Sequence, residues 1–454
     1  SLLSAAVLMF AYDKWWPSGQ PITSLAVLPI NPISTDPVVG YMAEGMTETL
    51  NNELGRIEAL RVISSQSVNK YKVTDKNIPE IASELNADAI LEGSIQGFDN
   101  KLKVVLRLID GRSDHQIWRG SFDSEEHEIR ALLGEVARTV AAEIDISLSP
   151  EDSAHFTRDR ELSPEAFRYW TIGNHYLKSL EDDSFQKARD AFNLALERDP
   201  DYAEAYAGIA QAYLFEGSWA GTKDANLILP LAKETAEKAL QLDPGNAEAN
   251  FTLGMIRRYE WDWIGAERAF RDASELNPND TIGLMEFANF LIAVGRTDEA
   301  IEIATRAVEI DPISSTTINE LGWAFFVGEQ FGSALDEYQR SLRLDPELLQ
   351  THMIMADFYI HQHQFDKAVP HLEKLNGLAA SLPGGALGML GLHYGLIGQK
   401  QETERILSRL LEKAKSEYVP ETAFAYLHLG LENFAEAINW LEAAFDARDP
   451  SLFY

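Results

Sequence analysis

The fold is decided by residues 281–312, TIGLMEFANFLIAVGRTDEAIEIATRAVEIDP, and by the copies of this pattern on either side of them. The pairs Asp243-Pro244, Asn277-Pro278, Asp311-Pro312 and Asp345-Pro346 follow one another at intervals of 34 residues. Each proline ends a helix, because the residue before a proline is pushed out of the helical region of backbone space. The pattern therefore predicts pairs of helices that stack in a regular array.

The period of 34 residues is that of the tetratricopeptide repeat, and this part of the chain resembles tetratricopeptide repeat proteins. An earlier copy ends at Asp199-Pro200, and the surplus before Pro244 is interpreted as a lengthened loop near residues 216–225. Later copies are less regular and end near Asp449-Pro450. The sequence predicts a solenoid of about eight repeats over residues 164–454. The resemblance implies binding of a peptide or protein rather than catalysis.

Binding in such arrays uses the concave wall, which is lined by the first helix of each repeat. Side chains at helical spacing in the clearest copies are predicted to face this wall, namely Phe251, Met255, Tyr259, Met285, Asn289, Ile292, Asn319, Trp323, Phe326, Met353, Asp357 and His361. Such a wall is apolar and adaptable through its methionines, so it suits an amphipathic helix or an extended peptide. An alternative stays open, in which these side chains pack against other repeats or against the N-terminal unit.

Residues 24–150 follow a different pattern. Short apolar runs such as 25–28 and 89–95 are typical of buried strands, and the stripes within 36–60 and 125–148 are typical of amphipathic helices. The order β-α-β-α-β-β-β-α predicts a small mixed sheet covered by helices. With the array, the expected fold class is α+β: a small α/β domain followed by an all-α solenoid.

Several short motifs in this region resemble, in their order, the TolB-like (FlgO-like) domain. They are Ser24-Leu25-Ala26-Val27-Leu28-Pro29, Glu44-Gly45-Met46-Thr47-Glu48, Leu60-Arg61-Val62-Ile63-Ser64, Leu91-Glu92-Gly93-Ser94 and Gln116-Ile117-Trp118. The resemblance covers about residues 24–148 and brings no catalytic residues with it. It implies a place beyond a single transmembrane helix and before tetratricopeptide repeats, as in CadC-like membrane-anchored transcription regulators and related membrane cyclases.

The first residues of the sequence agree with the expected transmembrane helix before this domain. Residues 1–12 are uncharged and apolar, and Trp15 and Trp16 follow, as at a membrane interface. We expect residues 1–16 to be the C-terminal part of a transmembrane helix, with linkers at 17–23 and 151–163. A signal peptide and an ordinary packed helix are the alternatives. The expected location is the bacterial inner membrane, crossed once, with the bulk of the chain in the periplasm.

Composition excludes several classes of function. The chain has 454 residues, no cysteine, and 71 Asp and Glu against 39 Lys and Arg, which gives a net charge of −32. So large an acidic excess repels the phosphates of nucleic acid, and direct contact with DNA is not expected. Neither a glycine-rich phosphate loop nor a metal-binding His-Glu-x-x-His pattern occurs. No cofactor, metal site or catalytic residue is predicted, and the chain is not expected to be an enzyme.

The expected function is a membrane-anchored sensor or scaffold that binds a protein or peptide partner and relays or localises a signal. The first hypothesis makes it the extracytoplasmic half of a one-component transcription regulator. A second makes it the corresponding half of a membrane adenylate cyclase or kinase, and a third makes it an adaptor subunit of an envelope complex. A homodimer is left open.

Overall fold

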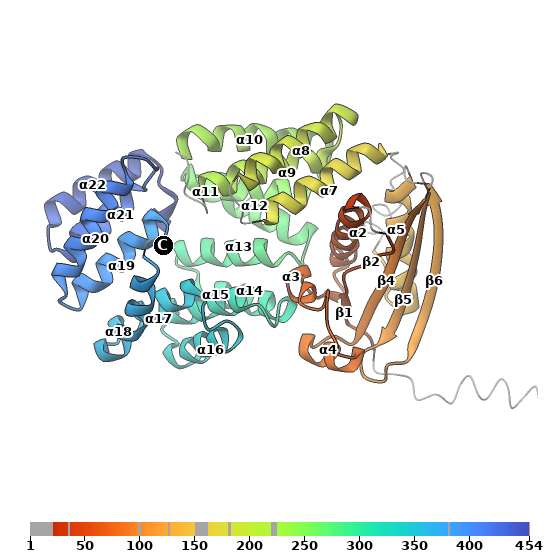
Figure 1. Ribbon diagram of the computed structural model, residues 1–454, viewed down its shortest axis with the longest axis horizontal. Coiled ribbons are helices and arrows are strands. Elements are labelled where there is room, and N and C mark those ends of the chain that lie inside the picture. The colour runs from red at the N-terminus through yellow and green to blue at the C-terminus, as the bar shows by residue number, and fades with distance from the viewer. Residues whose placement is uncertain are drawn as a thin grey trace, which may run out of the picture.

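The computed structural model describes residues 21–34, 37–98, 101–125, 128–149, 162–179, 183–218, 225–379 and 382–453. An N-terminal domain with a β-sheet is followed by a long helical array (Figure 1). The predicted membrane segment at residues 1–16 lies outside these ranges. Within them, no helix combines the length and the apolar character that crossing a bilayer requires.

The N-terminal domain contains a mixed sheet in the order β3-β1-β4-β5-β6, with β2 paired to β4. Its strands are β1 (Ser24–Val27), β2 (Asn31–Pro32), β3 (Arg61–Val62), β4 (Ala89–Phe98), β5 (Lys101–Asp110) and β6 (Gln116–Glu125). β1 runs parallel to β3 and β4, whereas β4, β5 and β6 are antiparallel neighbours. The prediction of a small mixed sheet is confirmed.

Helices cover both faces of this sheet. They are α2 (Pro37–Gly55), α3 (Ser65–Asn69), α4 (Ile78–Leu85) and α5 (Ile129–Glu143). Helix α2 buries Met46, Leu50 and Leu54 against one face, at the spacing of a single helical stripe. On the other face Val68 and Leu85, from α3 and α4, join a separate apolar cluster. The domain is thus a helix–sheet–helix sandwich.

The array consists of antiparallel helix pairs. In chain order they are α7 (Pro164–Lys178) with α8 (Ser184–Arg198), α9 (Ala203–Gly217) with α10 (Ala225–Leu242), α11 (Ala247–Tyr259) with α12 (Trp263–Leu276), α13 (Thr281–Ala293) with α14 (Thr297–Ile310), α15 (Ser315–Val327) with α16 (Phe331–Leu344), α17 (Leu349–His361) with α18 (Phe365–Gly377), α19 (Gly384–Leu396) with α20 (Lys400–Lys413), and α21 (Glu421–Gly430) with α22 (Phe434–Asp446). A short 3₁₀ helix follows at Pro450–Phe453.

Small residues let the two helices of a pair approach closely. A Cβ atom on Gly322 of α15 would lie 2.5 Å from the ring of Tyr338 on α16, which is too close for any side chain. The ring of Tyr338 fills the space between the two helices and is fully buried. The glycine and the aromatic residue are therefore a matched pair, as the repeat pattern predicts.

The sheet domain is bound to the array through the turns between repeats. Ser67 donates a hydrogen bond to the carboxylate of Asp311, and Arg61 donates one to the backbone oxygen of Glu309. Asn279 accepts from the Val62 N–H and donates to the Gly55 oxygen at 2.7 Å. We call the array turns at Gly245, Asn277–Asn279 and Glu309–Ile313 the docking edge. Because the docking edge spans three successive turns, it joins the sheet domain to the array through an extended interface.

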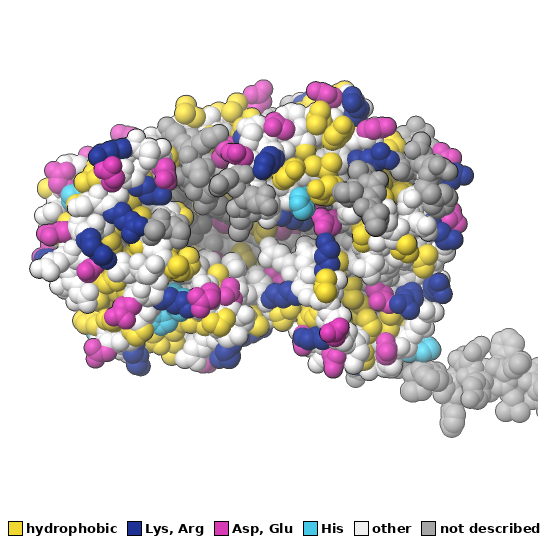
Figure 2. Space-filling view, in the orientation of Figure 1, with side chains coloured by type: hydrophobic (Ala, Val, Ile, Leu, Met, Phe, Trp, Pro, Cys, Tyr) yellow, Lys and Arg dark blue, Asp and Glu magenta, His cyan; other side chains and the backbone are white. Residues whose placement is uncertain are grey.

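The array curls until its last repeat meets an earlier one. The ring of Phe445, at the end of α22, stacks on Trp261 beyond α11 with 5.2 Å between ring centroids. Asn226 of α10 donates a hydrogen bond of 3.0 Å to the Ala447 oxygen. Helix α13 lies at the middle of the molecule, and α20 and α22 lie at its left end (Figure 1). Figure 2 shows the same face hollowed at its centre.

Candidate partner-binding wall

The structure places many of the predicted groove residues in the core of the array. Phe251, Met255, Tyr259, Met285, Asn319, Phe326 and Met353 are all buried. Asn289, Ile292, Trp323 and Asp357 are half-buried, and His361 is exposed. The prediction of an open apolar groove made of these side chains is thus corrected for the buried members. They pack between helices, because a side chain at their offset lies against the next repeat.

The less buried stripe of each first helix includes the predicted residues Trp323 and Asp357 together with residues that the prediction did not name. On α15 it runs through Thr316, Glu320 and Trp323, and on α17 it runs through Gln350 and Asp357. These positions share offsets within the 34-residue repeat. We call the surface formed by the stripes of α13, α15, α17 and α19 the inner wall. On α15 and α17 it mixes polar side chains with Trp323, whereas the side chains of α13 and α19 that are not buried, such as Ile292 and Met389, are mostly apolar.

Polar contacts link each first helix to the next. Arg258 of α11 pairs with Glu286 of α13 at 3.1 Å, and Asn289 of α13 donates to Glu320 of α15 at 3.3 Å. Gln350 of α17 donates to the other oxygen of Glu320. Further along, Asp357 of α17 contacts His393 of α19 at 3.3 Å. We call this series the inner ladder. It crosses five consecutive first helices without passing through a second helix.

Glu320 stands at the centre of the inner ladder with an unbalanced charge. Its two carboxylate oxygens accept hydrogen bonds from the uncharged amides of Asn289 and Gln350. Among the described residues, no cation lies within ion-pair distance of it. Burial raises the pKa of Glu320 to about 7, and the nearby carboxylate of Glu286 acts in the same direction.

The same electrostatic pattern continues toward the sheet domain. Burial raises the pKa of Glu248, on α11, to about 7, and Asp280 contributes to the rise. Burial also raises the pKa of Asp280 at the start of α13. The contribution of Asp280 has this direction because a like charge opposes the ionisation of Glu248.

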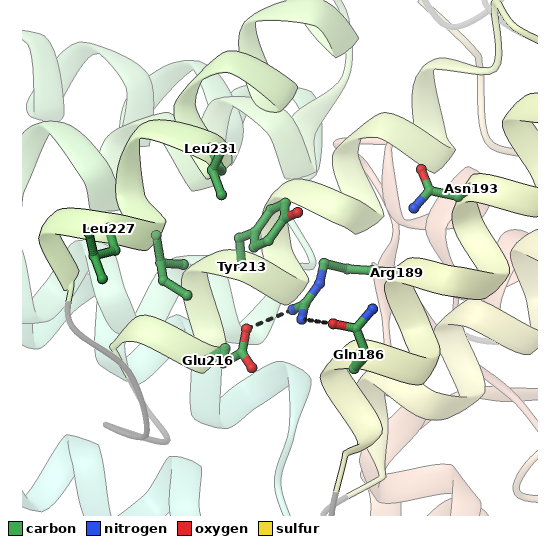
Figure 3. A pocket seen from close by; sticks show the side chains of 8 residues that line it. Gln186, Arg189, Asn193, Tyr213, Glu216, Leu227 and Leu231 are labelled. Atoms are coloured by element: carbon green, nitrogen blue, oxygen red, sulfur yellow. Dashed lines mark hydrogen bonds and ion pairs between the residues drawn. The ribbon is translucent and has the colours of Figure 1, made fainter. Parts of the chain in front are cut away.

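A second feature is a cavity of about 400 Å³ between α8, α9 and α10. Arg189 lies in it and donates to Glu216 at 2.8 Å and to Gln186 at 2.7 Å (Figure 3). The guanidinium also lies 4.6 Å from the ring centroid of Tyr213. Because this cation is already neutralised, the cavity offers no strong charge to a ligand.

Histidines cluster in the later repeats. The Nδ1 atoms of His352 and His371 lie 2.8 Å apart, and burial together with His352 lowers the pKa of His371 to about 4. His361 contacts the Phe326 ring edge-on instead. In the part of the chain that the structure describes, no three His, Asp or Glu side chains are grouped as metal ligands would be.

Sequence reasoning missed Glu286, Glu320 and Gln350. A signal for the first two was present, because Glu286 and Glu320 are 34 residues apart and so occupy equivalent positions in successive repeats. That both take part in contacts between first helices follows only from the structure. Gln350 has no such signal, since its contact depends on the approach of α17 to α15.

Comparison with known proteins agrees with the helical part of this description. A family model described as tetratricopeptide repeat matches residues 284–314. The chain therefore carries tetratricopeptide repeats, and proteins built on these repeats typically bind protein or peptide partners.

Two curated proteins are similar over part of their length. "Putative adenylate cyclase 3" of Rhizobium meliloti (strain 1021) is 29% identical over 218 residues, which are 47% of this chain and 37% of that protein. "Small glutamine-rich tetratricopeptide repeat-containing protein 2" of Mycosarcoma maydis is 33% identical over 85 residues, which are 19% of this chain and 24% of that protein. The chain thus spans well under two thirds of either relative.

Solved structures show similarity as well. YrrB, described as a TPR protein with an unusual peptide-binding site, is 25% identical, with coverage of 41% of this chain and 89% of that chain and a TM-score of 0.29. PilF of Pseudomonas aeruginosa is 18% identical, with coverage of 47% and 91% and a TM-score of 0.37.

Proposed function

We propose that this chain is a non-catalytic scaffold that binds a protein or peptide partner on its inner wall. The observation that carries the proposal is the inner ladder, a series of polar contacts that links five first helices and reaches solvent at Gln350 and Asp357, next to the half-buried Trp323. A surface of this length matches an extended polypeptide better than a small molecule.

The N-terminal domain is proposed to be TolB-like and to follow a membrane anchor formed by residues 1–16. The mixed sheet supports the first part, and the apolar sequence of those residues supports the second. In this arrangement the docking edge would hold the array in a set orientation to the membrane. Relay of a signal would then run from the inner wall through the docking edge.

Of the two proposals for the larger protein, we rank a membrane adenylate cyclase above a one-component transcription regulator. The name of the Rhizobium meliloti relative supports this ranking. The similarity leaves more than half of that relative unmatched, which is enough for a separate catalytic domain. The chain described here would then be its partner-binding half, and an adaptor subunit is the remaining alternative.

Photo-crosslinking tests the partner-binding proposal. A photoreactive amino acid replaces Trp323 on the inner wall, and in a control it replaces Ile264, which is 80% exposed on α12. The variants are produced in cells as the full chain and irradiated. We expect a defined adduct from position 323 and none from position 264. Adducts from position 264 alone, or from neither position, would contradict the proposal.

A separate assay tests the absence of catalysis. The purified chain is incubated with ATP and divalent metal, and cyclic AMP is measured. We expect no product above the level of a buffer control. Product formed by this chain would contradict the non-catalytic part of the proposal.

A further inference from the structure

Beneath the stretch of inner wall between α15 and α17 lie buried polar groups that have no hydrogen-bond partner among the described residues. The hydroxyl of Tyr338 is fully buried and, within the described residues, makes no hydrogen bond. The side-chain nitrogen and oxygen of Asn319, next to Glu320 in the chain, are also buried and make no hydrogen bond within the described residues. Buried polar groups without partners are uncommon in folded proteins, because each costs about 1–3 kcal/mol.

The Tyr338 hydroxyl lies among carboxylates. Burial raises its pKa far above the ordinary range, and the charges of Glu320 and Asp357 add to the rise. The ring of Tyr338, on α16, packs against Gly322 of α15 and lies 6.0 Å, between ring centroids, from Phe358 of α17. Since Glu320 and Asp357 lie on the same stretches of α15 and α17, the three side chains belong to one region of the array.

This region is rich in acceptors and poor in cations. Glu320 receives only amide hydrogen bonds, and Asp357 contacts one histidine nitrogen while its side chain stays 41% exposed. A hydroxyl oxygen and two carboxylates offer more lone pairs than the neighbouring donors occupy. An ammonium group carries three donors and no acceptor, so it complements such a set. Trp323, half-buried on the same stripe, adds an aromatic face that attracts cations.

We propose that this region receives a basic side chain, lysine or arginine, from an extended segment of a protein partner. The inference rests on the proposed function and gives the partner its chemistry. Neighbouring helices pack about 8–10 Å apart, and an extended chain advances about 3.3 Å per residue. One basic residue in every three therefore keeps pace with successive repeats. The wall selects a cationic strand and repels acidic segments.

Fluorescence anisotropy with synthetic peptides tests the inference. The probe is a labelled twelve-residue peptide with lysine at every third position and serine or alanine elsewhere, and the matched probe has glutamine in place of lysine. We expect the lysine probe to bind at least about tenfold more tightly. We also expect its affinity to fall about tenfold between 50 and 300 mM salt, because solvent ions screen the charges. Equal binding of the two probes, or no binding of either, would overturn the inference.

Variants locate the binding. The double variant E320Q/D357N keeps the size of both side chains and should weaken the lysine probe about tenfold, with circular dichroism confirming the fold. Y338F should weaken it about threefold. The control E302Q removes an exposed carboxylate on the outer helix α14 and should leave binding unchanged. An effect of E302Q equal to that of the double variant would overturn the assignment of the site.

The two proposals fail separately. If Trp323 crosslinks to a partner while the glutamine probe binds as well as the lysine probe, the inner wall binds a partner but not by charge. If position 323 yields no adduct, the proposed function itself is wrong, whatever the peptides do.

Discussion

The docking edge and the inner wall are made of the same repeats, yet they treat polar side chains in opposite ways. At the docking edge, the carboxylate of Asp311 is fully buried and receives hydrogen bonds from Ser67 and Thr317. On the inner wall, Glu320 is half-buried and accepts hydrogen bonds from two amides. The comparison teaches that Asp311 is fully enclosed because the sheet domain covers it, whereas Glu320, which that domain does not cover, stays partly exposed.

The largest expected effect comes from breaking the docking edge at Asp311. The substitution D311A leaves the hydroxyls of Ser67 and Thr317 buried without their acceptor, which costs about 1–3 kcal/mol. We expect the urea midpoint of unfolding to fall accordingly. Asp345 occupies the equivalent position one repeat later and is only half-buried, so D345A is the matched control with a smaller loss. Equal losses in both variants would show that docking adds nothing.

The close contact between α2 of the sheet domain and α7 of the array offers the next test. A Cβ atom on Gly45 of α2 would lie 2.0 Å from Cγ2 of Thr171 on α7. We therefore expect G45A to lower the free energy of unfolding by about 1–3 kcal/mol, less the gain in helix propensity of alanine over glycine. The double variant G45A/T171A removes the clashing methyl group and should recover part of the loss. No recovery in thermal melts would argue against this contact.

On the inner wall, the contribution of Glu320 to stability should depend on pH. The Glu320 carboxyl ionises near 4.5 when unfolded and near 7 when folded, so the folded state holds its proton more tightly. The resulting stability is fully present below pH 4.5 and is lost as the pH rises through 7. The variant E320Q lacks this loss, so its melting temperature should exceed that of the wild type at pH 8. At pH 4 and below, the two should agree, and a constant difference at all pH values would refute the account.

The smallest expected effect belongs to the histidine pair and has the opposite sign. The pKa of His371 is about 4 in the folded chain and 6.5 in the unfolded chain, so the unfolded state takes up the proton first. Stability contributed by neutral His371 is lost as the pH falls from 6.5 toward 4. The melting temperature of the H371N variant should therefore change less with pH over this window. H363N is the control, because His363 is exposed and its positive φ of 54° suits asparagine.

Regular patterns in the sequence predicted the fold in outline. The 34-residue spacing predicted the helix pairs, and the apolar runs predicted a mixed sheet with helices on it. Asn246 and Ser314, which follow the Asp-Pro pairs, cap the next helix, because their side chains accept from its backbone N–H groups. The short elements β2 and α3 were missed, because two- and five-residue segments carry too little periodicity to be recognised.

The candidate site was predicted less well, for a reason of geometry. Of the residues predicted on α15, Trp323 lies in the observed stripe with Glu320, whereas Asn319 and Phe326 are buried, so the two stripes differ by a small rotation about the helix axis. Amphipathic patterning cannot fix that rotation in a helix such as α15, where apolar residues occur on most sides. Only the position of the neighbouring repeats decides which side is open.

The sequence by itself therefore determined most of the local structure: which segments form the helices of the repeats, how many residues one repeat takes, and which longer segments form a sheet. These properties depend on backbone preferences and on the spacing of residues along one chain segment. The tertiary structure decided which polar groups meet. Asp311 finds Ser67, and Glu320 finds Gln350, across long stretches of chain or between helices of different repeats. Such contacts depend on the curvature of the whole array, which no single repeat encodes.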